Sequence, residues 1–187
     1  TAEDESGDAR KFATELARKA AERGVAFRFD AAIESIEAAG GKVTGVRLAG
    51  GERLSADAYV VALGSFSPLL LKPLGIGIPV YPAKGYSATV PLDSGDTAPM
   101  VSLTDDGRKI VFSRLGDRLR IAGTAEFTGY DTSLNEVRCQ ALVRRMGALF
   151  PSLAGRGGIE FWAGLRPATP SNVPLIGATA LPNLYLN

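Results

Sequence analysis

The sequence contains no histidine, and its only cysteine is Cys139. Without imidazole, the chain lacks the commonest general base, the usual partner of a catalytic serine and the commonest metal ligand. A single cysteine excludes an internal disulfide and a cysteine metal cluster. Cys139 lies in a helical pattern, where we interpret it as a small packed residue rather than a nucleophile. Any chemistry of this chain therefore depends on other groups.

Long apolar runs and an excess of one charge are also missing. No segment approaches the roughly 20 apolar residues that a membrane-spanning helix needs. The 21 basic and 20 acidic residues leave a net charge of +1, and Arg144–Arg145 is only a pair, interpreted as a solvated helix face. This balance argues against a nucleic-acid partner. Hydrophobic residues make up 45% of the 187, enough for the core of one domain or two small ones.

The sequence starts with TAEDESGDAR, without an initiator methionine, and stops within the strand-like run NLYLN. We therefore expect a fragment of a longer polypeptide. Comparing its intact mass with that of the full gene product would test this expectation.

The first clear pattern is an amphipathic helix. Asp8 can cap its first turn, the helix is predicted from about Ala9 to Arg23, and Gly24 can end it. Apolar residues at helical spacing define one face, namely Ala9, Phe12, Ala13, Leu16, Ala17 and Ala20. Residues 25–29 then have the composition of a β-strand.

Two kinds of strand pattern follow. Residues 31–54 predict a short antiparallel meander with Gly-Gly turns at 40–41 and 50–51. The run from Tyr59 to Leu63 is apolar throughout and is ended by Gly64, which predicts a strand buried on both faces of a parallel sheet. This order of elements indicates part of a nucleotide-binding α/β domain.

From Pro68 the sequence changes character. A proline-rich segment is expected to cross into a second region, where short strands are predicted at about 84–91, 109–114 and 118–123. The last two are expected to form a hairpin through a Leu-Gly-Asp turn.

A helix and a strand complete the pattern. Ser133 and Glu136 have the spacing of a capping box at the start of a helix that Pro151 ends. Its predicted core face is Leu134, Val137, Ala141, Leu142, Met146 and Leu149. Residues 159–165 predict a strand that leads into Arg166, after which the chain is expected to return to the first domain.

Three short motifs could carry chemistry. The end of the 59–63 strand, at Ala62, Leu63 and Gly64, could let the backbone approach a nucleotide, but a plain turn glycine explains these residues better. Lys84, Gly85 and Tyr86 could offer a cation, a close backbone approach and a hydroxyl, although a surface lysine, a bend and a half-buried tyrosine are favoured modestly. No GxGxxG phosphate loop occurs anywhere in the sequence.

Arg166 is the third motif, a permanent cation among small and apolar residues. Its planar guanidinium suits a carboxylate, and Pro167 holds it in an extended conformation. A bidentate pair with a substrate carboxylate and a structural ion pair with one of the chain's own acids are about equally supported.

Three long stretches together resemble one family: GDARKFATELARKAAERGVAFRF, DAYVVALGSFSPLLLKPLGIGIPVYPAKGYS and FWAGLRPATPSNVPLIGATALPNLYLN. They are similar to the small subunit of D-amino-acid dehydrogenase, within the wider FAD-dependent D-amino-acid oxidase and glycine oxidase group. The resemblance runs over essentially the whole chain, and the last two stretches are the specific ones.

The resemblance implies a mixed fold class, α/β plus α+β. Part of a doubly wound FAD-binding domain (residues 1–67) is expected to join an antiparallel-sheet substrate domain (residues 68–166), and residues 167–187 are expected to return to the first domain. The family's N-terminal GxGxxG element and its C-terminal Gly-His-Gly flavin segment are both missing. The fragment alone is therefore expected to hold no FAD and to be inactive.

The resemblance also assigns residues. Arg166 matches the arginine that binds the substrate carboxylate, and Tyr86 is a candidate for a second carboxylate contact because the hairpin strand carries no tyrosine at 111–114. The cofactor-binding positions that it implies are Ala32, Ile33, Ala62, Leu63, Gly64 and Gly85.

The activity that the resemblance implies is the oxidation of D-amino acids to 2-oxo acids and ammonia, with hydride transfer to FAD. Such chemistry needs orientation and exclusion of water rather than a strong base, so it is compatible with a chain without histidine. The implied electron acceptor is a respiratory one such as a quinone. We expect a cytoplasmic location. The full-length protein could also bind peripherally to the inner face of the bacterial inner membrane.

Three other interpretations remain open. The parent could be an oxidase of the glycine or sarcosine type on the same fold, which rapid peroxide formation would reveal. The isolated fragment could be a non-catalytic module because its cofactor cradle is incomplete. It could also be a scaffold domain, in which case Arg166 would form an internal salt bridge.

Overall fold

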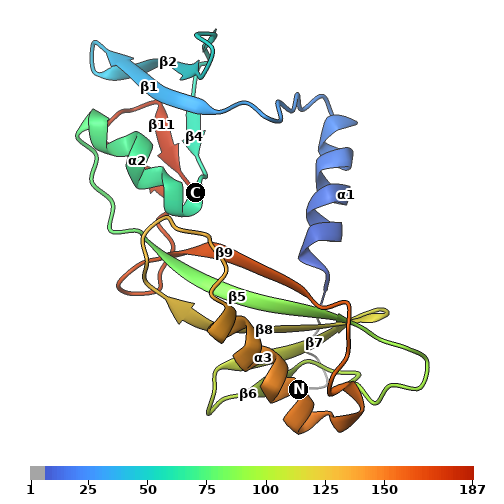
Figure 1. Cartoon of the computed structure of the whole chain (residues 1–187). Coiled ribbons are helices and arrows are strands. Elements are labelled where there is room, and N and C mark those ends of the chain that lie inside the picture. The colour runs from blue at the N-terminus through green and yellow to red at the C-terminus, as the bar shows by residue number, and fades with distance from the viewer. Residues whose placement is uncertain (1–6) are drawn as a thin grey trace. The chain divides into compact units, whose positions relative to one another are not determined.

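A computed structural model describes residues 7–187 (Figure 1). The chain divides into two compact units. We call the first the antiparallel unit, which consists of Lys84–Leu165 together with the segment that ends at Ala26. We call the second the parallel unit, which consists of Phe27–Ala83 and Arg166–Asn187. The second unit thus combines segments from the middle and the end of the sequence.

The parallel unit contains the predicted meander. Strands β1 (Ile33–Ala39), β2 (Lys42–Leu48) and β3 (Arg53–Leu54) form an antiparallel sheet in that order. Gly40 and Gly41 connect the first two strands with φ values of 59° and 76°. Two successive left-handed residues are the requirement of a tight type I′ hairpin, so both glycines are needed at this turn.

In the second small sheet, the predicted strand near residues 59–63 has a parallel partner, as expected, but it is less buried than predicted. Strand β4 (Tyr59–Val61) pairs in parallel with β11 (Leu184–Leu186), which also pairs antiparallel with β10 (Gly177–Ala178). Val61 packs in the core, whereas Val60 is 63% exposed. The prediction of a strand buried on both faces is therefore wrong for this structure, since nothing in residues 7–187 encloses the side chain of Val60.

The proline-rich segment contains short helices that the sequence did not predict. These are a 3₁₀ turn at Gly64–Phe66, α2 (Ser67–Leu71) and a second 3₁₀ turn at Lys72–Leu74. Pro68 lies in the first turn of α2, where its missing N–H costs nothing. Leu71 of this helix packs with Val61 and Leu184 in the core of the parallel unit.

The first helix of the antiparallel unit is α1 (Ala9–Ala21), as predicted, with Asp8 accepting hydrogen bonds from the backbone N–H groups of Arg10 and Lys11. None of its residues is buried, and Phe12 is 70% exposed. Residues 25–29 form no strand, which corrects that prediction. A strand needs a pairing partner, and within the described part of the chain no strand pairs with this segment.

A five-stranded sheet dominates the antiparallel unit, with the strand order β6-β7-β8-β5-β9. The bounds of these strands are β5 Tyr81–Pro91, β6 Leu103–Asp105, β7 Ile110–Leu115, β8 Arg118–Glu126 and β9 Glu160–Ala168. The hairpin of β7 and β8 is the predicted one, and Gly116 in its turn has a φ of 66°. Helix α3 (Glu136–Leu149) lies along one face of the sheet (Figure 1).

The start and the inward face of α3 differ from the prediction. Asn135 rather than Ser133 caps the helix, because its side chain accepts a hydrogen bond from the N–H of Arg138. The hydroxyl of Ser133 donates to Asp131 instead. Cys139, Leu142 and Met146 are the buried residues of the helix, whereas the predicted Leu134 and Val137 are exposed.

The core of this unit joins one face of the sheet to α3 and to the turn at Pro151–Leu153. Its buried members are Tyr86, Ala88, Val90, Ile110, Phe112, Leu119, Ile121, Cys139, Leu142, Met146 and Leu153. None of the helices in residues 7–187 combines the length and the apolar composition that crossing a lipid bilayer requires.

Candidate functional site

Arg166 lies near the carboxyl end of β9, which continues past the predicted strand end at Leu165. Its side chain is exposed, and within residues 7–187 it forms no salt bridge. The internal ion pair that a scaffold domain would give Arg166 is therefore not found in the described part of the chain. The guanidinium remains available for an external anion.

The end of β4 brings together three of the predicted cofactor-binding residues. Ile33, at the start of β1, lines a cavity of about 230 Å³ with Ala62 and Leu63, which directly follow β4. The rest of the lining is contributed by Ile36, Val46, Tyr59, Val60, Val61 and Leu70. Apart from the tyrosine hydroxyl, all these side chains are apolar, so the cavity suits a flat apolar group rather than a charged one.

Gly64 lines a different cavity in the same unit, of about 120 Å³, with Val61 and Pro167. Its φ of 53° lies in the left-handed region, where a side chain is strained, and an added Cβ would lie 3.5 Å from Cγ of Pro167. Ala32 lies apart from both of these cavities. Its carbonyl accepts a 2.8 Å hydrogen bond from the N–H of Ala49. Ala32 lines a separate hollow with residues 27–31, so the structure does not bring all the predicted positions into one site.

Lys84 is the most enclosed charge of the antiparallel unit. Its side chain is only 2% exposed, and Nζ donates to Oδ2 of Asp131 at 2.9 Å and to the carbonyl of Ser133 at 3.0 Å. Nζ also lies 3.4 Å from Oε2 of Glu126. These contacts raise the pKa of Lys84, with the hydrogen bond to Asp131 as the largest cause, so this lysine stays protonated at physiological pH.

Tyr86 belongs to the same cluster. Its buried hydroxyl donates a 2.5 Å hydrogen bond to Oε2 of Glu126, and Nζ of Lys84 lies 5.5 Å from its ring centroid. Burial, followed by the hydrogen bond to Glu126, raises the pKa of Tyr86, so the hydroxyl keeps its proton. Gly85 is buried between these two residues, beside a β-bulge in the pairing with β8.

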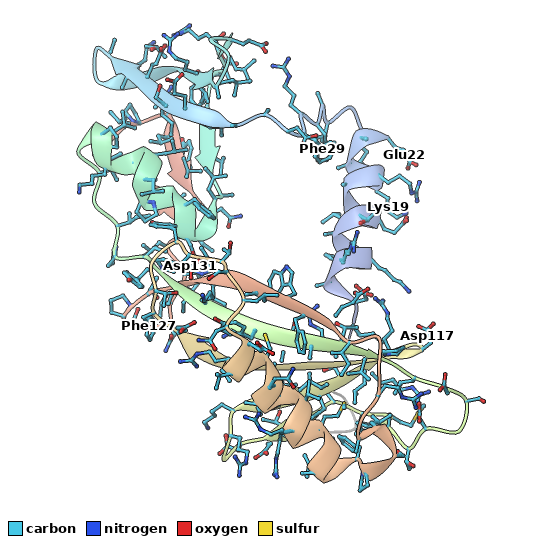
Figure 2. The ribbon with its side chains drawn as sticks, in the orientation of Figure 1. Lys19, Glu22, Phe29, Asp117, Phe127 and Asp131 are labelled. Carbon is cyan, nitrogen blue, oxygen red and sulfur yellow. The ribbon has the colours of Figure 1, made fainter. Side chains whose placement is uncertain are left out.

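Two carboxylates complete this cluster, and sequence reasoning missed both. The backbone N–H of Ser133 and then Lys84 lower the pKa of Asp131 to about 2. The hydroxyl of Tyr86 is the largest cause that lowers the pKa of Glu126, and Arg138 lies 3.3 Å from its Oε1. The sequence did offer one signal for a carboxylate partner, namely a lysine within the largely apolar strand β5. A buried cation requires a carboxylate. Asp131 is labelled in Figure 2.

The comparison with protein families gives one result for nearly the whole chain. The profile described as "FAD dependent oxidoreductase" matches residues 2–187. The chain belongs to this family. This match confirms that the chain is a member of the FAD-dependent group. The expected fold class, α/β plus α+β, is confirmed as well.

Relatives within this FAD-dependent family include curated bacterial proteins. The chain is 61% identical over its full length to the D-amino acid dehydrogenase of Dechloromonas aromatica, of which it covers 46%. It is 53% identical to the D-amino acid dehydrogenase of Paramagnetospirillum magneticum, of which it covers 44%. The chain thus spans somewhat less than half the length of these relatives.

Solved structures of the family show the same fold at lower identity. Iminodiacetate oxidase from Chelativorans matches 95% of the chain with a TM-score of 0.85 at 23% identity, and the chain covers 48% of it. Glycine oxidase from Geobacillus kaustophilus matches 93% with a TM-score of 0.77 at 24% identity, and the chain covers 46% of it. At these identities the likeness concerns the fold alone.

The residues of this chain fit part of the FAD that the family binds. The cavity beside Ile33, Ala62 and Leu63 offers an apolar wall and the free backbone at the carboxyl end of a parallel strand, where nucleotides bind in α/β sheets. It offers no basic side chain for the phosphates, and the sequence has no GxGxxG loop. The lining of this cavity thus fits an apolar part of the cofactor and not its phosphates.

Proposed function

We propose that this chain is part of an FAD-dependent dehydrogenase that oxidises D-amino acids to 2-oxo acids and ammonia. The observation that carries the proposal is the 61% identity, over the full chain, to a protein named D-amino acid dehydrogenase. Identity at this level supports the same substrate class far more strongly than the shared fold does.

The proposal assigns one part of the chain to FAD and another to the substrate. Residues 1–67 and 167–187 would face FAD, and residues 68–166 would cover the substrate. Ala32, Ile33, Ala62, Leu63, Gly64 and Gly85 are the proposed cofactor contacts. Since the sequence contains no phosphate loop, we propose that this chain alone retains no FAD.

Arg166 is the proposed anchor of the substrate carboxylate. Its exposed guanidinium has no acidic partner in residues 7–187, and the arginine fork can bind a carboxylate through two parallel hydrogen bonds. FAD, when bound, would supply the hydride acceptor for the substrate Cα–H bond. The chain's own contribution is to orient the Cα–H bond and to exclude water, which requires no histidine.

Tyr86 remains a weaker proposal for the second carboxylate contact, because its hydroxyl already donates to Glu126. As a donor to Glu126 it can still accept a hydrogen bond but cannot give its only proton to a substrate carboxylate. A role in substrate binding therefore requires Tyr86 to exchange one acceptor for another.

The electron acceptor and the location are further parts of the proposal. We propose a respiratory acceptor such as a quinone, a cytoplasmic location, and peripheral contact of the full-length protein with the inner face of the bacterial inner membrane. The alternative is an oxygen-using amine oxidase of the glycine or sarcosine type on the same fold; the likeness to iminodiacetate oxidase and glycine oxidase supports that fold and neither activity.

The decisive experiment mixes the full-length protein anaerobically with D-alanine and, separately, with L-alanine while the visible absorption of the flavin is followed. Bleaching by the D-enantiomer alone supports the proposal. Bleaching by glycine or sarcosine but by neither alanine would support the oxidase, as would rapid peroxide formation in air. The L-enantiomer belongs in the experiment because L-proline dehydrogenase from P. horikoshii shares this fold with a TM-score of 0.76.

A second experiment tests Arg166 directly. In the full-length protein, Arg166→Ala is expected to weaken the binding of D-alanine by about 2–5 kcal/mol, the usual cost of truncating one partner of a charged pair. Arg166→Lys should recover only part of this loss, because an ammonium cannot make the bidentate contact. An unchanged Kd for D-alanine in the alanine variant would remove Arg166 from the site.

A further inference from the structure

Arginines from two different elements line one hollow of the antiparallel unit. We call it the arginine hollow. It has a volume of about 220 Å³ and is lined by Arg108, Ala141, Arg144, Arg145 and Ala148. All of these residues belong to the segment Lys84–Leu165, so the hollow is formed within one unit. In the sequence only the pair at 144–145 stands together, and the fold adds a third guanidinium to it.

Helix α3 and the turn between β6 and β7 position the arginines. On α3 the four lining residues follow the spacing i, i+3, i+4 and i+7, so they share one face of the helix. Arg108 lies in the turn, where its backbone N–H donates to the carbonyl of Asp105 at 3.2 Å. Nε of Arg145 donates a 2.5 Å hydrogen bond to Oδ2 of Asp105. The turn is thereby tied to the helix on which the other two arginines lie.

Two guanidiniums of the arginine hollow have no carboxylate partner in the part of the chain that the structure describes. Arg108 and Arg144 are exposed and form no salt bridge within residues 7–187. Asp106, the second acid of the turn, is paired with Lys109. Like charges that converge on one hollow repel one another, and an anion bound there replaces this repulsion with attraction. The planar guanidinium fork suits the oxygens of a phosphate group.

The outward face of α3 favours a lipid phosphate over a phosphate ion in solution. Val137 lies four residues before Ala141 on the same face and is 73% exposed. The sole acidic residue of α3 is Glu136 in its first turn, so the rest of the helix carries no negative charge. Apolar residues and arginines on one helix face are typical of a helix that binds an anionic membrane surface. A free phosphate would need the arginines but not the exposed valine.

We propose that the arginine hollow binds the phosphate of an anionic phospholipid and so docks the antiparallel unit on a bilayer, with Val137 entering the interface. This inference rests on the proposed peripheral membrane contact and names the surface that makes it. It uses none of the residues proposed to contact FAD or the substrate carboxylate. Membrane binding and oxidation of the substrate are therefore separate readouts.

Co-sedimentation of the full-length protein with vesicles tests the proposal. The wild type should bind vesicles of equal parts phosphatidylcholine and phosphatidylglycerol but not vesicles of phosphatidylcholine alone. Added salt should weaken the binding, because it screens exposed charges. The double variant Arg108→Gln/Arg144→Gln should bind the anionic vesicles about 25-fold more weakly, since each arginine near an anionic surface contributes about fivefold.

The matched control is Lys42→Gln/Lys72→Gln, which removes the same number of exposed positive charges from the parallel unit. This control should leave vesicle binding nearly unchanged. Equal weakening in both double variants would show that only the net charge matters and would overturn the arginine hollow as the docking site.

A further variant distinguishes the lipid from a free phosphate. Val137→Ser should weaken binding to the anionic vesicles about fivefold, because an apolar contact with the bilayer is lost. Calorimetry with inorganic phosphate is the second arm. A wild type that binds inorganic phosphate through Arg108 and Arg144 but does not bind the anionic vesicles would overturn the lipid assignment.

Bleaching of the flavin by D-alanine separates failure of this inference from failure of the proposed activity. If the wild type oxidises D-alanine but binds no vesicle, the peripheral contact and the arginine hollow are overturned and the oxidation stands. If the wild type binds anionic vesicles without oxidising D-alanine, the activity is overturned and the docking surface stands. If the arginine double variant binds these vesicles as well as the wild type does, only the role of the arginines is overturned.

Discussion

The two units of the chain differ in how completely they bury their own apolar residues. In the antiparallel unit, the buried face of the sheet, α3 and the following turn form one continuous core, in which Leu119, Leu142 and Leu153 are fully buried. The core of the parallel unit is smaller, and its strand β4 leaves Val60 exposed beside buried Val61. Hairpins bring antiparallel strands together locally, whereas a parallel strand needs partners from distant parts of a sequence.

The largest expected effect comes from truncating one core residue in each unit. Leu142→Ala in the antiparallel unit and Leu71→Ala in the parallel unit should each cost about 2–5 kcal/mol of unfolding free energy, because both side chains are fully buried. Denaturant unfolding followed by Trp162 fluorescence should detect chiefly the first change, since Trp162 belongs to the antiparallel unit. Equal shifts of this transition in both variants would show that the two units unfold as one.

The next prediction concerns acid stability in the antiparallel unit. The pKa of Asp131 is about 2 in the folded chain and higher in the unfolded one, because folding supplies the N–H of Ser133 and the ammonium of Lys84. Its stabilising contribution is therefore complete above about pH 4 and is lost as the pH falls toward 2. Asp131→Asn should reduce the loss of stability over this range.

Thermal unfolding of the wild type and the variant at several pH values between 5 and 2 measures this effect. Asp117→Asn, in the exposed turn between β7 and β8, is the matched control (Figure 2). An acid-induced loss of stability as steep in Asp131→Asn as in the wild type would contradict the prediction.

The smallest expected effect is at the start of α3. Asn135→Ala should cost about 1 kcal/mol of unfolding free energy, because the N–H of Arg138 loses its partner, whereas Asn135→Gly should cost only a few tenths. Chemical denaturation monitored by circular dichroism measures both. If Asn135→Ala has no effect, the helix begins elsewhere, for example at Ser133 as the sequence suggested.

The predicted and the observed elements together show which parts of the fold are determined by the local sequence. The hairpins at Gly40–Gly41 and at Gly116 were predicted correctly, because turn chemistry and alternating strands act over a few residues. Residues 25–29 have strand composition but no partner in the described chain, so composition alone predicted a strand that does not form. At α3, Ser133 matched the capping pattern, but its hydroxyl donates to Asp131, which sequence spacing did not reveal.

The candidate site was predictable only in part. Arg166 stood out because an arginine among small residues before proline is unusual, but the predicted strand ended at Leu165 whereas β9 continues to Ala168. Ile33, Ala62 and Leu63 were assigned through the family resemblance, and the structure then placed them around one cavity. Glu126 and Asp131 could not be found from sequence, because they approach Lys84 from distant positions, Asp131 from 47 residues along the chain.

The strand β6 lies at one edge of the five-stranded sheet and is only three residues long. It ends at Asp105, whose carboxylate forms a 2.5 Å salt bridge with Nε of Arg145 on α3. Because this edge strand is so short, it offers little unpaired backbone to a strand of another molecule, and the carboxylate at its end is already paired. Along this side the sheet therefore presents little backbone through which two copies of the chain could pair.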